Sequence, residues 1–428
     1  MNFNLYSSNK LEDLAAIFRR MIFDRPGPDP FVPETVVVQT QGMATWLEQE
    51  MARDGSIMAN FDMPFLQSFI LKTMRQLLPR EELEAFNREC RIFSPEVAAW
   101  RIFRLLGESA GRWPELDRYL TGSEPVRKRR QLAGRIADLF DQYQVYRGDL
   151  LEAWRRGEEP GRYVWQQQLY REIAKGFTGP YGWFRKFFER VPERDLWSRV
   201  PVRISVFGVG TMPPLYLNFL RHLSAITEVN LFYLNPCREF WDTYEKRFRD
   251  RLADKNSGVF ESTDVENPLL TSLGAQGRSF FAQTLELPEL ARVRSAELFR
   301  SFVPEKSESL AYPGATMLQT IQEDILRMRR RGPDGDDVEV GRTRKIDYRR
   351  DRSIRVHSCH TIRRELEVLK DELIRLFDES NGVVQPRDVI VMAPDINAYE
   401  PYIRAVFNDE TFEGRYGISD RSLRQESL

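Results

Sequence analysis

The sequence predicts an α/β protein in which a parallel sheet is interrupted by an all-helical block and followed by the start of a second α/β unit. Strand-like and helix-like segments alternate near the N-terminus, which is typical of a parallel sheet. From about Ser94 to Arg199 the strand signals disappear, and they return at Val202–Val209 (VRISVFGV). A new strand–helix–strand pattern opens at Ser353.

Residues 1–93 are predicted to form the first part of the sheet domain. Phe3–Ser7 and Thr35–Thr40 (TVVVQT) are predicted strands because they are short, apolar or β-branched runs. Helices are expected over Leu11–Phe23, Gly42–Arg53 and Phe69–Leu78.

Residues 94–199 are predicted to form a helical insertion. Apolar residues recur there at spacings of three and four, with almost no strand signal between them. The expected helices are Glu96–Leu106, Glu115–Leu120, Lys128–Asp149 and Tyr163–Phe177.

Residues 200–340 are predicted to resume the sheet domain. Strands are expected at Val202–Val209 and Glu228–Leu234, with the helix Pro214–Ser224 between them. No elements are assigned to Arg249–Leu290, and Leu318–Arg331 is predicted as a helix that ends in a basic run.

A charged stretch at 341–352 is predicted as an exposed linker, and 353–428 as the beginning of the second α/β domain. That domain is expected to be partial. Its predicted elements are the strand Ser353–Ser358, the helix Ile362–Phe377, the strand Asp388–Met392 and the helix Tyr399–Val406.

The composition is that of a globular protein, with 428 residues, 42% of them hydrophobic and 30% charged, and a net charge of −1. This length predicts two or three domains. Without an overall basic excess, any contact with nucleic acid must come from a local patch. Three separated cysteines and an N-terminus without an apolar signal core indicate a cytoplasmic protein, and no apolar run is long enough to span a membrane.

The helix Lys128–Asp149 carries the most suggestive pattern of polar residues. Asp138, Asp141 and Gln142 stand at i, i+3 and i+4, on a face turned away from the apolar stripe. The basic cluster Arg127–Arg130 precedes the stripe and Arg147 follows it. Amide and carboxylate groups can bond base edges, and Arg129 and Arg130 can bond phosphates. A solvated helix face is the alternative for this pattern.

Two α/β units with a helical insertion in the first have the organisation of a helicase-like, RecA-like motor. Such a motor needs a glycine-rich phosphate loop after its first strand and carboxylates at the end of a later strand for magnesium. Here Ser7–Lys10 (SSNK) follows the first strand, and Phe207–Thr211 (FGVGT) ends the later one. We therefore expect no ATPase site and no nucleotide cofactor.

No hydrolytic or metal site is expected either. The acidic residues of the sequence are scattered along helices rather than paired as in metal nucleases. His357, Cys359 and His360 cluster at a predicted strand end, where packing is favoured over metal ligation. No catalytic residue is assigned.

Long strings of the sequence resemble the RecC family, the gamma chain of exodeoxyribonuclease V. They are DPFVPETVVVQTQGMATWLEQEM, ANFDMPFLQSFI, ADLFDQYQVYR, VFGVGTMPPLYL, LNPCREFW, NPLLTSLGAQGR, IQEDILRM, VHSCHTIRRELEVLKDEL, RDVIVMAPDI and ISDRSLRQ. The resemblance covers nearly the whole chain and corresponds to the N-terminal part of a longer family chain. It implies a helicase-like fold without ATPase motifs.

The resemblance also implies a function and partners. Family members work with a beta and an alpha chain in double-strand-break repair and homologous recombination. They help split double-stranded DNA, channel single-stranded DNA and recognise the regulatory Chi sequence. An active helicase–nuclease subunit of the related two-subunit machines and a purely structural scaffold subunit are the alternatives.

The family's Chi-recognition residues can be placed on this sequence by the same resemblance. Five lie in the match ADLFDQYQVYR, and two lie near FDMPFLQSFIL, where leucine replaces the tryptophan of the family. The positions are Asp138, Leu139, Asp141, Gln142, Arg147, Phe65 and Leu71.

Overall fold

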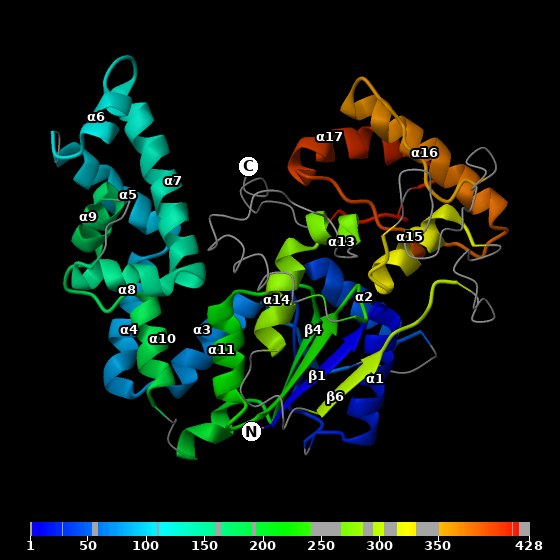
Figure 1. The fold of residues 1–428 in the computed structure, drawn as a ribbon, viewed down its shortest axis with the longest axis horizontal. Coiled ribbons are helices and arrows are strands. Elements are labelled where there is room, and N and C mark those ends of the chain that lie inside the picture. The colour runs from blue at the N-terminus through cyan, green and yellow to red at the C-terminus, as the bar shows by residue number, and fades with distance from the viewer. Residues whose placement is uncertain are drawn as a thin grey trace, which may run out of the picture. The chain divides into compact units, whose positions relative to one another are not determined.

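The computed structural model describes residues 2–27, 29–53, 59–108, 111–158, 164–190, 194–239, 241, 267–285, 294–303, 315–330, 351–412 and 414–418 (Figure 1). The chain divides into two compact units. The first comprises Met1–Gln39, Met58–Glu261 and Thr271–Phe299. The second comprises Thr40–Ile57, Ser262–Leu270 and Arg300–Leu428.

A parallel sheet forms the centre of the first unit, confirming the predicted α/β class. Its six strands among the described residues follow the order β3-β2-β4-β5-β1-β6, and every pairing is parallel. The strands are β1 (Asn2–Ser8), β2 (Glu34–Val37), β3 (Phe61–Asp62), β4 (Arg203–Val209), β5 (Glu228–Leu234) and β6 (Arg294–Leu298). The short edge strands β3 and β6 have no counterpart among the strands that the sequence predicts.

Helices supply the connections that parallel strands require. In the first unit they are α1 (Leu11–Asp24), α3 (Leu66–Leu77), α4 (Arg80–Ile92), α5 (Pro95–Glu108), α6 (Pro114–Leu120), α7 (Pro125–Tyr146), α8 (Gly148–Arg156), α9 (Val164–Ala174), α10 (Pro180–Phe188), the 3-10 helix η1 (Arg194–Arg199), α11 (Pro214–Leu223) and α14 (Ala275–Leu285). The helix α13 (Pro268–Leu273) crosses the boundary between the units.

Aromatic side chains pack on both faces of this sheet. Phe18 of α1 lies edge-on to Phe232 of β5, with ring centroids 5.5 Å apart. Successive strand residues point to opposite faces, so the neighbouring Tyr233 faces the other way. Its ring lies 5.4 Å from that of Phe280 in α14. Helices α1 and α14 therefore cover opposite faces of the sheet (Figure 1).

A buried ion pair joins β2 and β4 at the amino end of the sheet. The Nε and Nη2 atoms of Arg203 donate to the two carboxylate oxygens of Glu34, both at 2.8 Å. The Nη1 atom donates to the Arg25 carbonyl at 3.0 Å. Only 8% of the Arg203 side chain and 15% of the Glu34 side chain are exposed. The pair fixes β2 beside β4.

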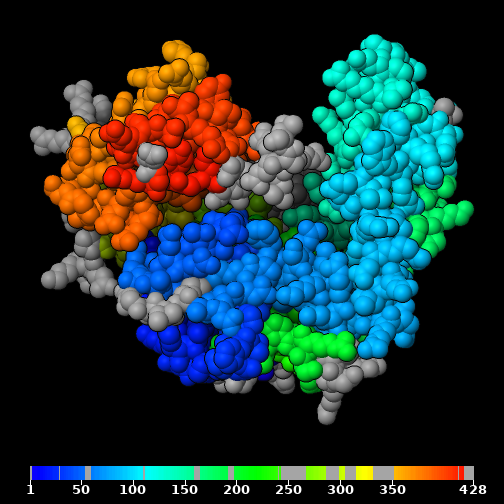
Figure 2. Space-filling model, turned by 180° about the vertical axis from the view of Figure 1, so that it is seen from behind, coloured from blue at the N-terminus to red at the C-terminus, as the bar shows by residue number. Residues whose placement is uncertain are grey.

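The described part of the chain between β3 and β4 forms helices joined by short turns, without a further strand. Figure 2 shows the surface of its first helices, α3 to α5, in light blue to cyan. Helices α4, α8 and α10 are absent from the prediction. In α4 the buried residues are only Phe86 and Glu89, which leaves a weak apolar period. The Glu89 carboxylate accepts from the Gly179 N–H at 2.8 Å and so caps the start of α10.

The described part of the second unit contains helices and no strand. Its helices are α2 (Gln41–Met51), α15 (Met317–Leu326), α16 (Ile362–Glu379), the 3-10 helix η3 (Pro386–Asp388) and α17 (Ile396–Phe407). Its core includes Leu366, Phe407 and Phe412. No helix among the described residues is both long and apolar enough to cross a membrane.

Three predictions for this unit need correction or lie outside the described residues. The strands expected at Ser353–Ser358 and Asp388–Met392 are wrong, because neither segment pairs with a neighbouring strand. Their apolar side chains stay exposed, as with Val356 at 91%. Helix α15 ends before the expected Arg331, since Met328 adopts a φ of 52°. Residues 341–350 of the predicted linker are not described.

Candidate nucleic-acid interface

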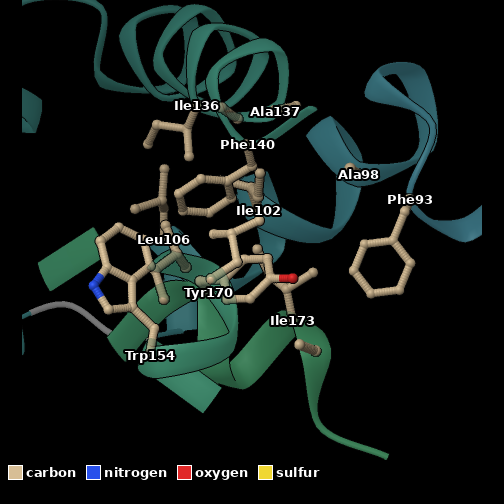
Figure 3. Close-up of a cluster of buried hydrophobic side chains, with 14 of the residues drawn as sticks. Phe93, Ala98, Ile102, Leu106, Ile136, Ala137, Phe140, Trp154, Tyr170 and Ile173 are labelled. Carbon is tan, nitrogen blue, oxygen red and sulfur yellow. The ribbon is translucent and has the colours of Figure 1, made fainter. Parts of the chain in front are cut away.

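Helix α7 is held in place by the largest described hydrophobic cluster of the helical block. One side of the helix contributes Ile136, Ala137 and Phe140, which face α5, α8 and α9 (Figure 3). The ring of Phe140 lies edge-on to that of Tyr170, with centroids 5.4 Å apart. The other members shown in Figure 3 include Ala98, Ile102, Leu106, Trp154 and Ile173. This packing fixes which residues α7 presents to solvent.

The apolar stripe predicted for α7, which consists of Leu132, Ile136, Leu139, Phe140 and Tyr143, is confirmed in part. Ile136 and Phe140 are buried, whereas Leu132, Leu139 and Tyr143 are only half-buried. Gln144 is buried one turn after Phe140, and sequence analysis does not single it out. Its amide donates to the Tyr170 hydroxyl at 3.0 Å and accepts from the Tyr181 N–H at 3.2 Å. These bonds tie α7 to α9 and α10.

Four residues at i, i+4 spacing form a row along α7, which we call the polar row: Arg130, Gly134, Asp138 and Gln142. The side chains of Asp138 and Gln142 are exposed. Within the described ranges, neither makes a hydrogen bond or an ion pair. Both are therefore available to an external partner, and a rigid helix sets their spacing.

Asp141 does not share this exposed face, contrary to the prediction. The residue is half-buried, and desolvation raises the pKa of its carboxyl. The nearby carboxylates of Asp138 and Glu96 raise it further. Asp141 is therefore partly covered by its surroundings, unlike Asp138 and Gln142.

Replacing Asp141 by asparagine is expected to stabilise the protein at neutral pH. A carboxyl whose pKa is raised by folding disfavours the folded state once it ionises. The penalty is thus fully present above the raised pKa and disappears as the pH falls below the ordinary aspartate value. Because the site is partly solvated, the rise in melting temperature should be on the order of 1–3 °C. Thermal unfolding near neutral pH and at about pH 4 checks this, and a loss of stability in the Asp141→Asn variant at neutral pH would refute it.

Arg147 is exposed at the corner between α7 and α8, with its guanidinium 5.8 Å from the centre of the Tyr143 ring. The next residue, Gly148, packs directly against Tyr181 of α10. A methyl group at Gly148 would lie 1.9 Å from Cδ2 and 2.4 Å from Cγ of that ring. The absent side chain is therefore what allows the corner to close on α10.

Gly148→Ala is expected to lower the free energy of unfolding by about 1–3 kcal/mol, because the added methyl overpacks the corner. Gly134→Ala is the matched control on α7, since a methyl there meets nothing within 4 Å. Alanine should stabilise the helix at Gly134 by up to about 1 kcal/mol. Urea denaturation measures both changes. Equal effects of the two substitutions would contradict the packing argument.

The cations of Arg127–Arg130 are engaged with neighbouring groups to different degrees. Arg127 forms an ion pair with Glu124 at 3.0 Å, and Lys128 donates to the Thr121 carbonyl at 3.2 Å. The Arg129 guanidinium lies 4.2 Å from the centre of the Phe103 ring, and that of Arg130 lies 4.4 Å from the Trp100 ring.

Arg129 and Arg130 differ in what they can offer a ligand. Arg129 is half-buried, and its Nη1 occupies the space above Gly107, 2.3 Å from where a methyl would stand. Arg130 is exposed and has no ion pair within the described ranges. Arg130 is thus the cation of this cluster best placed to meet a phosphate.

Phe65 and Leu71 belong to a different part of the fold, at the start of α3 and within it. Phe65 precedes the first turn of that helix and is 46% exposed, and Leu71 is half-buried. The helix packs against α4 and η1. Phe65 is therefore accessible to a ligand, while Leu71 offers only part of its side chain.

Comparison with known proteins identifies the family. The family model described as the RecC N-terminal domain matches residues 3–328. The chain belongs to the RecC family. It is 33% identical to the RecBCD enzyme subunit RecC of Escherichia coli, over 98% of this chain and 40% of that protein.

Other RecC relatives show the same partial coverage. The RecBCD enzyme subunit RecC of Haemophilus influenzae is 28% identical over the whole of this chain and 41% of its own length. That of Mycobacterium tuberculosis is 27% identical over 99% of this chain and 38% of its own length. The chain thus spans about 40% of the RecC proteins it matches.

The described part of this RecC family chain contains no group of three or more histidine, cysteine, aspartate or glutamate residues able to hold a metal ion. His357 instead lies 3.7 Å from Glu372, between its Nε2 and a carboxylate oxygen.

Proposed function

We propose that this chain is the DNA-binding part of a non-catalytic subunit of a helicase–nuclease complex. It would channel single-stranded DNA and recognise a Chi-like regulatory sequence during double-strand-break repair and homologous recombination. Its partners would be the beta and alpha chains of exodeoxyribonuclease V and both single- and double-stranded DNA. We place this work in the cytoplasm.

The polar row carries this proposal. Asp138 and Gln142 are exposed, and their side chains have no partner within the described ranges. The packed core beneath them holds the helix rigid, which keeps their donors and acceptors at a fixed spacing. Aspartate accepts from the cytosine amine, and glutamine bonds adenine on two atoms. Leu139, Asp141 and Arg147 would border the same contact, with Phe65 and Leu71 at a second point.

We assign a RecA-like origin to the sheet of the first unit. Its described strands are all parallel, and β1 lies in the interior of the sheet. The turn after β1 therefore lies at the carboxyl ends of the strands, where such sheets bind ligands. That turn consists of Asn9 and Lys10 alone, and the Lys10 N–H donates to the Ser8 hydroxyl at 3.0 Å. A turn this short has no room to wrap a phosphate, which supports a subunit without its own ATPase site.

We further propose the domain boundaries that the sequence suggested. Residues 1–93 and 200–340 would form the helicase-like domain, with 94–199 as its helical insertion. Residues 341–352 would be a linker, and 353–428 would begin the second helicase-like domain. That segment exposes apolar side chains that a packed core would cover, among them Ile390 at 80% and Met392 at 83%.

Arg130→Gln tests the DNA-binding proposal in the full-length subunit assembled with its partners. Loss of one phosphate contact should weaken binding to all single-stranded sequences alike. It should also reduce the slope of log K against log salt by about 1. Arg20→Gln, at an exposed position of α1, removes the same charge and should leave the slope unchanged. If both variants behave like the unmodified complex, Arg130 makes no phosphate contact.

A further inference from the structure

An exposed tryptophan lies beside the polar row. Trp100 of α5 is 58% exposed even though the Arg130 guanidinium packs over its ring at 4.4 Å. The Phe103 ring also contacts the Trp100 ring edge to face, with ring centroids 6.0 Å apart and planes at 80°. Indole and guanidinium thus form a two-layer stack at the surface of the helical block.

The contacts between α5 and α7 place this stack within the seam that holds the polar row. Near the start of α7, Arg129 lies over Phe103 and Gly107, towards the end of α5. Nearer the end of α7, the carboxylate of Glu96, at the start of α5, contributes to the raised pKa of Asp141. The two helices therefore run antiparallel. Trp100 belongs to this seam through its contact with Arg130.

The polar row has a gap at this point. Gly134 lies one turn after Arg130 and one turn before Asp138, and a methyl group on it would meet nothing within 4 Å. Glycine in a helix interior is unfavourable by roughly 1 kcal/mol relative to alanine. The polar row thus leaves open space one helical turn from Arg130, whose guanidinium packs over Trp100.

We propose that Trp100 and Arg130 form a base-stacking site for single-stranded DNA, next to Asp138 and Gln142. The inference rests on the proposed function and adds to it a contact that no sequence pattern indicated. Bases stack on tryptophan and on the guanidinium plane of arginine, and only unpaired strands expose their base faces. A nucleotide would also offer a phosphate to Arg130 and a base edge to Asp138.

A protein partner fits this surface less well. Covering Trp100 with an apolar surface would bury the Arg130 guanidinium and the Asp138 carboxylate, and unpaired buried charges are costly. A single strand of DNA supplies a counter-charge and an aromatic plane together. Charge complementarity therefore favours the nucleic acid.

The test compares two strands of equal length, oligothymidine and a strand of abasic residues, bound to the full-length subunit assembled with its partners. Trp100→Ala should weaken oligothymidine binding by about 5- to 100-fold. Binding of the abasic strand should change by less than about twofold, because it has no base to stack. Trp100→Phe should retain part of the affinity. Gly134→Leu should act like Trp100→Ala, since its side chain fills the gap without loss of helix propensity.

Phe31→Ala is the control, since Phe31 is an aromatic residue exposed to 88% on a turn outside the helical block. It should bind both strands normally. Equal losses for the two strands in the Trp100→Ala complex, or no loss for either, would overturn the stacking site. Failure of that variant to assemble would overturn it as well, by making Trp100 a protein contact. A different result would contradict the proposed function itself: the Asp138→Ala and Gln142→Ala complexes would still respond to the recognition sequence.

Discussion

Replacing Asp138 and Gln142 by alanine is expected to remove the response of the assembled enzyme to its recognition sequence while unwinding continues. Each base-specific contact contributes about 1–3 kcal/mol, so each substitution should weaken recognition by one or more orders of magnitude. Both side chains are exposed, so truncating them leaves the core of the helical block intact. Unwinding and the response to the recognition sequence are measured separately on the full-length complex.

Gln131→Ala is the matched control, because Gln131 is exposed on α7 outside the polar row. It should leave both measurements unchanged. Leu139→Ala is a poor test of recognition, since Leu139 is half-buried and its truncation also costs packing. Loss of unwinding together with the response, or loss of neither, would mean that the polar row is only a solvated helix face.

Arg203→Ala is expected to lower the free energy of unfolding by about 3–5 kcal/mol, the largest effect on stability that we predict. The substitution leaves the Glu34 carboxylate at a largely buried position without the two hydrogen bonds at 2.8 Å. The strands β2 and β4 would then lose the ion pair that joins their amino ends. Urea denaturation measures the change.

The exposed pair of Lys72 and Asp62 provides the comparison for this effect. Their Nζ and Oδ2 atoms lie 3.1 Å apart, and the side chains are 59% and 41% exposed. Solvent screens such a pair, so Lys72→Ala should cost no more than about 1 kcal/mol. Similar costs for Arg203→Ala and Lys72→Ala would show that the Arg203–Glu34 pair does not stabilise the sheet.

The strands and helices predicted correctly are those whose apolar pattern is set by their own residues. β4 and β5 are buried on both faces, so each is a continuous apolar run in the sequence. The strand expected at Asp388–Met392 has the same local pattern but no neighbouring strand in the described residues. A strand is defined by its partner, and local sequence does not reveal whether one is present.

The same limit applies to the candidate site. The spacing of Asp138 and Gln142 along one helix sufficed to predict their shared exposed face. Asp141 is half-buried because α7 packs against other helices, and the spacing of residues along α7 does not reveal that packing. Trp100 acquires its place beside Arg130 only when α5 and α7 pack together. The burial of Asp141 and the position of Trp100 both depend on contacts between distant parts of the sequence, so local patterns could not predict them.

A crosslink map of single-stranded DNA across the assembled complex tests most directly whether α7 contacts the strand. Photoreactive bases placed along the bound strand would report every residue that they contact. We expect crosslinks on the exposed side of α7 between Arg130 and Gln142, and on Trp100 of α5. Crosslinks confined to other parts of the complex, with none on this stretch of α7, would contradict it.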